Sequence, residues 1–137
     1  MKFLKTIPTF PVHDIDTAVI FYETKFGFIC RHKENGFAIL VRDSIELHLW
    51  LANDHNWKIW GPFLFLGPVR TGAESFLAGT HSCRIEVEGI DSVYQELKKA
   101  EVLHRRTTVV ESTAWGTKEF SAVDLHRNLI TFYESNQ

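Results

Sequence analysis

The chain has 137 residues, of which 45% are hydrophobic and 23% charged, and its formal net charge at pH 7 is −2. This balance excludes disorder and a membrane span, and the slight negative charge argues against nucleic-acid binding. The N-terminal residues contain no long apolar run, so no signal peptide is expected. Only Cys30 and Cys83 are present, too few for a disulfide framework, so we expect a cytoplasmic protein with reduced thiols.

The first half of the chain predicts a strand, a helix and three more strands. The first strand ends near His13, and the helix runs from Asp16, a suitable N-cap, to about Phe26, where Gly27 is the expected C-cap. Apolar stretches bounded by turn residues then predict a meander of three strands, at residues 28–33, 37–42 and 45–52.

The same order of elements recurs in the second half. Residues 12–19 align with residues 87–94, so Asp91 takes the place of the N-cap and a second helix runs to about Ala100. Three strands are expected after it, at 102–107, 117–124 and 129–134. We therefore predict an α+β fold of two βαβββ repeats in a single domain. This domain spans residues 1–137 and consists of repeat 1 (1–52), an aromatic connector (53–79) and repeat 2 (80–137).

Side-chain alternation divides each repeat into two faces. Glu46, His48 and Trp50 share one face of their strand, and the leucines between them share the other, which must pack on the helix. In the second repeat the same rule places Ser82 and Thr131 on mixed polar faces. Two sheets that curve together would enclose a cup lined by these mixed faces.

Several motifs together resemble the vicinal oxygen chelate superfamily, which includes glyoxalase I, extradiol dioxygenases and bleomycin resistance proteins. The resemblance covers nearly the whole chain and is greatest to the bleomycin resistance branch. One departure lies in the turn from Asp124 to Asn128, which lacks the glycine that the family has there. The motifs that carry the resemblance are IPTFPVHD at 7–14, GFAILVRD at 36–43, ESFLAGT at 74–80 and WGTKEF at 115–120.

In metal-dependent relatives, four strands each supply one ligand. The resemblance places these positions on Ile7, Glu46, Ser82 and Thr131, of which only Glu46 is a strong ligand, so no metal and no cofactor are expected. The alternative is a metal-dependent lyase or dioxygenase that uses Glu46 together with His48 and His81. His81 would have to be turned to the same face by a β-bulge.

Aromatic side chains are the expected ligand contacts of a metal-free cup. The resemblance implies Phe37 and Trp115, strand parity adds Trp50, and the connector adds Trp57 and Trp60, for which a core or dimer-interface role is an equal possibility. The expected polar partners are Glu46, His48, Ser82 and Thr131. For Glu46 a purely structural role, with its carboxyl satisfied by hydroxyls or by Arg84, is the other possibility.

The resemblance implies a binding protein rather than an enzyme. Its expected action is antibiotic resistance by sequestration of a glycopeptide drug or another bulky, partly aromatic small molecule. Pro8 matches a family proline that accompanies exchange of N-terminal arms, so a homodimer with two cups between its subunits is expected. No nucleic acid and no membrane are expected as partners. A regulatory or immunity module with the same fold is a third possibility.

Overall fold

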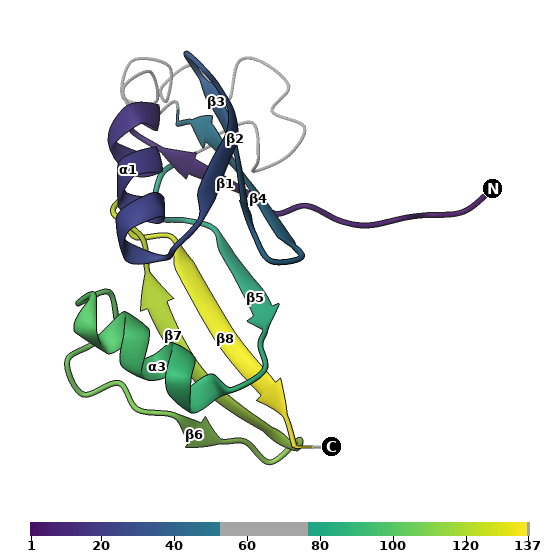
Figure 1. Ribbon diagram of the computed structural model, residues 1–137, viewed down its shortest axis with the longest axis vertical. Helices are drawn as coiled ribbons and strands as arrows, with labels where there is room; N and C mark the ends of the chain where they lie inside the picture. The colour runs from purple at the N-terminus through teal and green to yellow at the C-terminus, as the bar shows by residue number, and fades with distance from the viewer. Residues whose placement is uncertain (53–76, 137) are drawn as a thin grey trace, which may run out of the picture.

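The computed structural model describes residues 1–52 and 77–136, which form two four-stranded sheets, each with one helix (Figure 1). The first half contains β1 (Thr9–Val12), α1 (Ile15–Lys25), β2 (Ile29–Glu34), β3 (Phe37–Arg42) and β4 (Ile45–Leu51). The second half contains β5 (Ser82–Glu86), α3 (Ile90–Lys99), β6 (Glu111–Ser112), β7 (Thr117–Val123) and β8 (Leu129–Ser135). The predicted α+β class with two βαβββ repeats is confirmed. No helix in the described ranges is long and apolar enough to cross a membrane.

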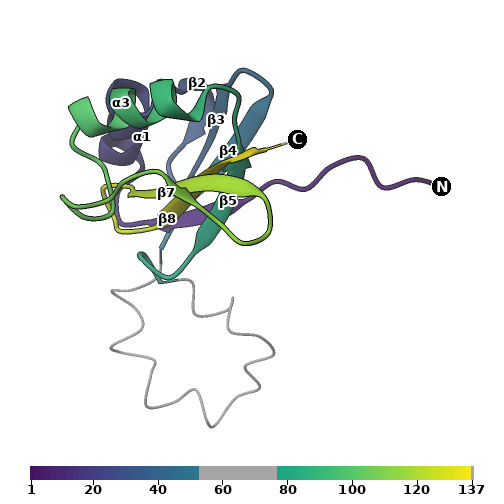
Figure 2. The same ribbon diagram turned by 90° about the horizontal axis from the view of Figure 1, so that it is seen from below.

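Both sheets have the same topology. Sheet A has the order β1-β4-β3-β2 and sheet B the order β5-β8-β7-β6. In each sheet the first strand of the repeat pairs in parallel with the last, and the other pairs are antiparallel. Figure 2 shows α1 and α3 on the same side of the two sheets, so neither of these helices lies on the opposite face of a sheet. We call these opposite faces the open face of sheet A and the open face of sheet B.

The helix-covered faces hold the hydrophobic core, as strand parity predicts. In β4, Leu47 and Leu49 are fully buried, whereas Trp50 on the other face is half exposed. In sheet B, Ile130 and Phe132 of β8 are buried in the same way. The burial of these aliphatic and aromatic faces against α1 and α3 is the main stabilising contribution, at about 25 cal/mol per Å² of apolar surface removed from water.

Both predicted N-caps are wrong. The N-cap of α1 is Asp14, because its backbone is extended and its carboxylate accepts the N–H of Thr17 at 3.1 Å, while Asp16 lies in the first turn. The N-cap of α3 is Gly89 in the left-handed region, not Asp91. A carboxylate from the far end of the chain, Glu134, accepts the N–H groups of Gly89 and of the next residue. Tertiary contact therefore replaces the local cap.

The strand expected at 102–107 does not form. Only a single β-bridge occurs there, at Leu103, and the edge strand of sheet B is β6, at Glu111–Ser112. The chain leaves the sheet in a turn in which Arg105 and Thr108 exchange two hydrogen bonds. The basic residues of this segment stay in solvent, where their charges are hydrated, and so the strand is displaced toward the less charged residues that follow.

One buried carboxylate joins the two halves. Asp124, only 4% exposed, follows β7 and accepts four hydrogen bonds: the Tyr22 hydroxyl at 2.8 Å, the His126 N–H at 2.8 Å, and the Asn128 N–H and side-chain amide at 2.9 and 3.0 Å. The Asn128 amide also donates to the carbonyl of Pro11 in β1 at 2.8 Å. Tyr22 lies in α1, so this cluster fixes the second half against both a helix and a strand of the first.

We expect Tyr22→Phe to lower the free energy of unfolding by about 2 kcal/mol at pH 7, because it removes a hydrogen bond to a buried carboxylate. Burial, followed by the Asp124 charge, raises the pKa of Tyr22 well above its ordinary value. The phenol therefore stays protonated in the folded state while the unfolded chain ionises near pH 10, so wild-type stability falls above about pH 10.

Urea titrations from pH 8 to 11 measure this difference, and Tyr22→Phe should flatten the alkaline decline. Tyr94→Phe is the matched control, because the Tyr94 hydroxyl donates to a neutral group, the backbone carbonyl of Thr108. It should lower the free energy of unfolding at pH 7 by less than Tyr22→Phe does. A Tyr22→Phe variant that declines as steeply as wild type would contradict the assignment.

The turn of residues 124–128 adopts the backbone that the family glycine would favour, with an arginine in its place. Arg127 has φ = 71°, in the left-handed region. A side chain there costs about 1–2 kcal/mol, because Cβ approaches the following carbonyl. The hydrogen bonds of Asp124 described above hold the turn in this conformation.

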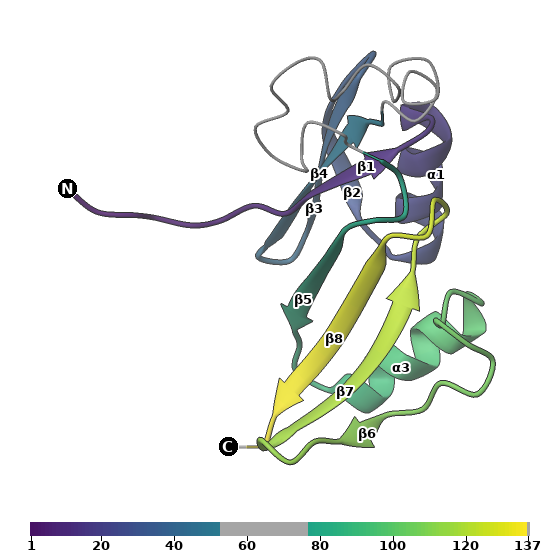
Figure 3. The same cartoon turned by 180° about the vertical axis from the view of Figure 1, so that it is seen from behind.

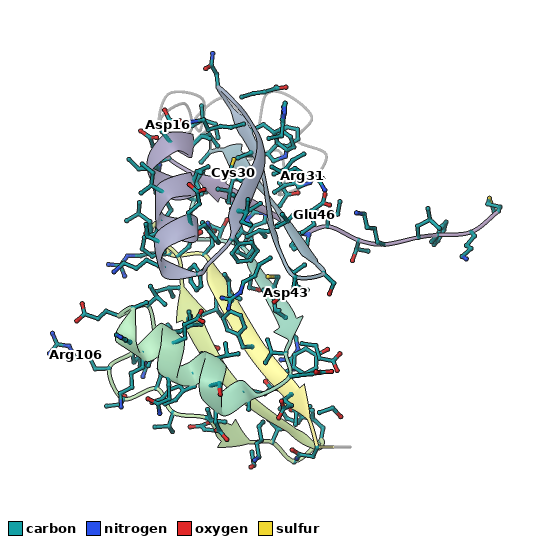
Figure 4. The ribbon with its side chains drawn as sticks, viewed as in Figure 1. Asp16, Cys30, Arg31, Asp43, Glu46 and Arg106 are labelled. Atoms are coloured by element: carbon teal, nitrogen blue, oxygen red, sulfur yellow. The ribbon has the colours of Figure 1, made fainter. Side chains whose placement is uncertain are left out.

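Arg127→Gly should therefore raise the free energy of unfolding by about 1 kcal/mol, after allowance for the greater freedom of glycine in the unfolded chain. Denaturant titration measures the change. Arg106→Gly is the control, because Arg106 is also exposed and points away from the body (Figure 4), and its φ is not positive. The control should be neutral or destabilising. Equal effects of the two substitutions would contradict the strain at Arg127.

Candidate ligand-binding faces

An aromatic cluster occupies the open face of sheet A. The register pairs Phe37 with Trp50 and Ile39 with His48, so side chains from β3 and β4 meet on this face. The Phe37 ring lies between the other two rings, with centroids 5.1 Å from His48 and 5.5 Å from Trp50, both edge to face. This geometry is favourable for aromatic pairs, and it leaves the Trp50 side chain half exposed.

Glu46 lies further along the same face and is surrounded by basic groups. Its carboxylate accepts hydrogen bonds from Lys5 Nζ at 3.1 Å and Arg31 at 3.3 Å, and it lies 2.8 Å from His48 Nε2. Figure 4 shows Arg31 and Glu46 side by side at the base of the N-terminal segment. The hydrogen bond with His48, and then that with Lys5, lowers the pKa of Glu46. Glu46 is therefore a charged but already partnered carboxylate.

Arg31 reaches Glu46 because of a β-bulge. The register of β2 against β3 shifts between Cys30 and His32, so Arg31 has no opposite residue. A bulge turns a side chain away from strict alternation. The partners that the sequence suggested for Glu46, hydroxyls or Arg84, are not the observed ones, since Arg84 pairs elsewhere.

The donor set does not fit a metal ion. Within residues 1–52 and 77–136 there is no group of three or more His, Cys, Asp or Glu side chains that could hold one. Ser82 pairs with Leu129 and not with Thr131, whose hydroxyl lies 2.9 Å from that of Ser121. His81 lies before β5, with Nδ1 2.9 Å from the Thr80 hydroxyl. We therefore derive no metal-dependent step from these residues.

A polar network centred on Glu119 covers the open face of sheet B. Arg84 donates two hydrogen bonds to the Glu119 carboxylate, at 3.0 and 2.6 Å, in the parallel geometry that makes such pairs strong. The Thr117 hydroxyl and the Trp115 indole N–H donate to the same carboxylate at 2.6 and 3.2 Å. These donors, Arg84 first, lower the pKa of Glu119 to about 2, so it is ionised at neutral pH.

Aromatic rings adjoin this network. The Arg84 guanidinium lies 4.6 Å from the centre of the Tyr133 ring, and the Tyr133 hydroxyl donates to Glu86 at 3.3 Å. Trp115 occupies the turn between β6 and β7 and is 70% exposed. The open face of sheet B therefore combines an exposed indole with a paired arginine.

One chain does not bring all the predicted site residues together. Phe37 begins β3 next to the β2–β3 turn, whereas the turn that carries Trp115 adjoins the C-terminal residues through a hydrogen bond from Asn136 to Gly116. Figures 1 and 3 place these two turns at opposite ends of the long axis. The predicted site residues therefore form two groups: Phe37, Glu46, His48 and Trp50 on sheet A, and Ser82, Trp115 and Thr131 on sheet B. Trp57, Trp60 and most of the connector lie outside the described residues.

Pro8 lies at the base of a projecting segment. Residues 1–8, which we call the N-terminal arm, extend away from both sheets (Figure 3), and the side chains of Phe3 and Leu4 are almost fully exposed. The carbonyl of Pro8 accepts the N–H of His48 at 3.0 Å, which extends the pairing of β1 with β4 and anchors the base of the arm to β4.

Sequence reasoning missed several residues of these faces. Glu119 could have been found, because parity places it in β7 on the same face as Thr117 and Ser121. Arg31 could not, because a bulge cannot be read from alternation. Nor could Lys5, which meets Glu46 only through the tertiary path of the arm.

No protein-family model matches the chain. It is 44% identical over 131 residues to bleomycin resistance proteins of Geobacillus stearothermophilus and Staphylococcus aureus, covering 96% of each protein. Among solved structures it is similar to a bleomycin resistance determinant encoded on the transposon Tn5, with a TM-score of 0.72, 18% identity and coverage of 98% and 100%. It is also similar to a bleomycin-binding protein complexed with bleomycin, with a TM-score of 0.69, 20% identity and coverage of 97% and 99%.

Proposed function

Because the chain belongs to the bleomycin resistance protein family, we propose that it binds a bleomycin-type glycopeptide or another bulky, partly aromatic molecule and confers resistance by sequestration. Sequestration requires affinity for the ligand but no covalent reaction, so a binding surface of aromatic side chains is sufficient for it. We place this action in the cytoplasm, where the two free thiols, Cys30 and Cys83, would stay reduced.

The aromatic cluster around Phe37 is the observation that carries the proposal. Each ring that a ligand covers removes about 150–200 Å² from water, which corresponds to roughly 4–5 kcal/mol of gross stabilisation. Phe37, His48 and Trp50 are held against one another, so little side-chain entropy is lost on binding. Because the nearby carboxylate of Glu46 is already paired, this face is suited to recognise rings more than charges.

A dimer would complete the site. The β2–β3 turn and the β6–β7 turn lie at opposite ends of one chain (Figure 1), so a twofold pair could place Phe37 of one chain opposite Trp115 of the other. The extended N-terminal arm, with its exposed Phe3 and Leu4, offers apolar surface for the contact, and Pro8 stands where the arm departs. We therefore propose an arm-exchanged homodimer with two equivalent cups.

Isothermal titration with copper-loaded and metal-free bleomycin tests the binding. Wild type should bind, and Phe37→Ala should weaken binding about 30-fold, which corresponds to ~2 kcal/mol. Ile20→Ala is the control, because this exposed residue of α1 lies on neither open face, and its affinity should match wild type. An absence of wild-type binding at tens of micromolar would remove the drug assignment.

Mixing two defective variants tests the shared cup. Phe37→Ala and Trp115→Ala chains should each bind poorly, but after unfolding and refolding together about a quarter of the cups should regain wild-type affinity. Half of the dimers are then mixed, and each mixed dimer has one intact cup. The control is the double variant Phe37→Ala/Trp115→Ala, unfolded and refolded in the same way. None of its cups should regain wild-type affinity. A failure to recover sites, or a monomer in sedimentation, would overturn the dimer proposal.

A further inference from the structure

We propose that Glu119 is a positioning residue that holds the Trp115 indole as a fixed, charge-neutral platform for a flat ring of the ligand. The inference rests on the proposed function for the identity of its ligand. It concerns the chain's own geometry, however, and can be tested with and without that ligand.

The turn that carries Trp115 is braced on both sides. The Thr113 N–H donates to the Thr117 carbonyl at 2.8 Å, and the two threonine hydroxyls lie 2.8 Å apart. The Gly116 carbonyl accepts the N–H of Asn136 at 2.9 Å, which ties the turn to the end of β8. The backbone beneath the indole is therefore held in place.

The indole itself is exposed and yet restrained. Trp115 is 70% exposed, and a side chain so open to solvent normally samples several rotamers. Its N–H, however, donates to the Glu119 carboxylate, which is only 13% exposed and held by Arg84 and Thr117. The ring is thus anchored at its polar edge, while its face stays available for stacking.

The ion pair beside the indole carries no net charge. Arg84 neutralises Glu119 through two hydrogen bonds, and its guanidinium also lies over the Tyr133 ring. A ligand group that approaches Trp115 therefore meets an indole beside a closed ion pair. This surface suits a flat heteroaromatic group bound by stacking, whose affinity should depend little on salt.

The ligand-free test measures motion of the indole. In ¹⁵N-labelled protein, the Trp115 Nε1–H signal, assigned by its loss in Trp115→Phe, should show a heteronuclear NOE like that of the backbone. Glu119→Gln should lower this NOE. Glu111→Gln is the matched control, because Glu111 is exposed and lies opposite Glu119 across β6 and β7, while the indole N–H donates to Glu119. This substitution should leave the NOE unchanged.

A double-mutant cycle with metal-free bleomycin tests the effect on binding. At about 0.5 M NaCl, which screens the charge of the unpaired Arg84, Glu119→Gln should weaken binding about 5- to 10-fold. In a Trp115→Phe background, whose ring has no N–H, the same substitution should change affinity less than about 2-fold.

The outcomes separate this inference from the proposed function. A mobile Trp115 indole in wild type, or an equal loss of affinity in both backgrounds, would overturn the positioning role even if bleomycin binds. If wild type does not bind bleomycin, but Glu119→Gln alone lowers the NOE of the Trp115 indole, the positioning role is supported and bleomycin is excluded as the ligand.

Discussion

The carboxylate of Asp124 is the point on which the two halves of this fold depend. Four donors converge on it from within 3.0 Å, and one of them, the hydroxyl of Tyr22, comes from 102 residues earlier in the chain. A buried carboxylate deprived of any of these donors is costly, so the cluster acts as a unit. A second tie, two hydrogen bonds from Arg42 to Glu96, joins the halves nearer the surface. Together they orient both sheets with their helices on one side and their open faces on the other.

The two open faces use opposite means to present aromatic rings. On sheet A, the rings of Phe37, His48 and Trp50 support one another edge to face. On sheet B, the exposed Trp115 indole is anchored by one hydrogen bond to Glu119. On each face a carboxylate beside the rings is paired with basic side chains. Glu46 is paired with Lys5 and Arg31, and Glu119 is paired with Arg84. These ring surfaces are the ones that we propose to contact the ligand, which fits sequestration of a partly aromatic molecule by burial.

Strand parity predicted the faces well because it is local. Alternation in β4 correctly separated Leu47 and Leu49 from Glu46, His48 and Trp50, since every residue of that strand is regularly paired. The rule failed where regularity failed. The bulge after Cys30 redirects Arg31, and the expected strand at 102–107 leaves the sheet after one bridge. The predicted cap of α3 failed for a related reason, since the N-terminus of α3 is satisfied by a carboxylate 45 residues away in sequence from Gly89.

The sequence by itself determined the repeat, the order of elements, the buried faces and the family resemblance, because periodicity and motif spacing express local backbone geometry. Only the tertiary structure decided which polar groups meet. The pairs of Lys5 with Glu46, Arg84 with Glu119 and Tyr22 with Asp124 join residues 35 to 102 positions apart. Such partners depend on how the sheets and the arm pack, and neither alternation nor composition encodes that packing. The separation of Phe37 from Trp115 along the chain's long axis is of the same kind, and it is the reason we propose a site shared by two chains.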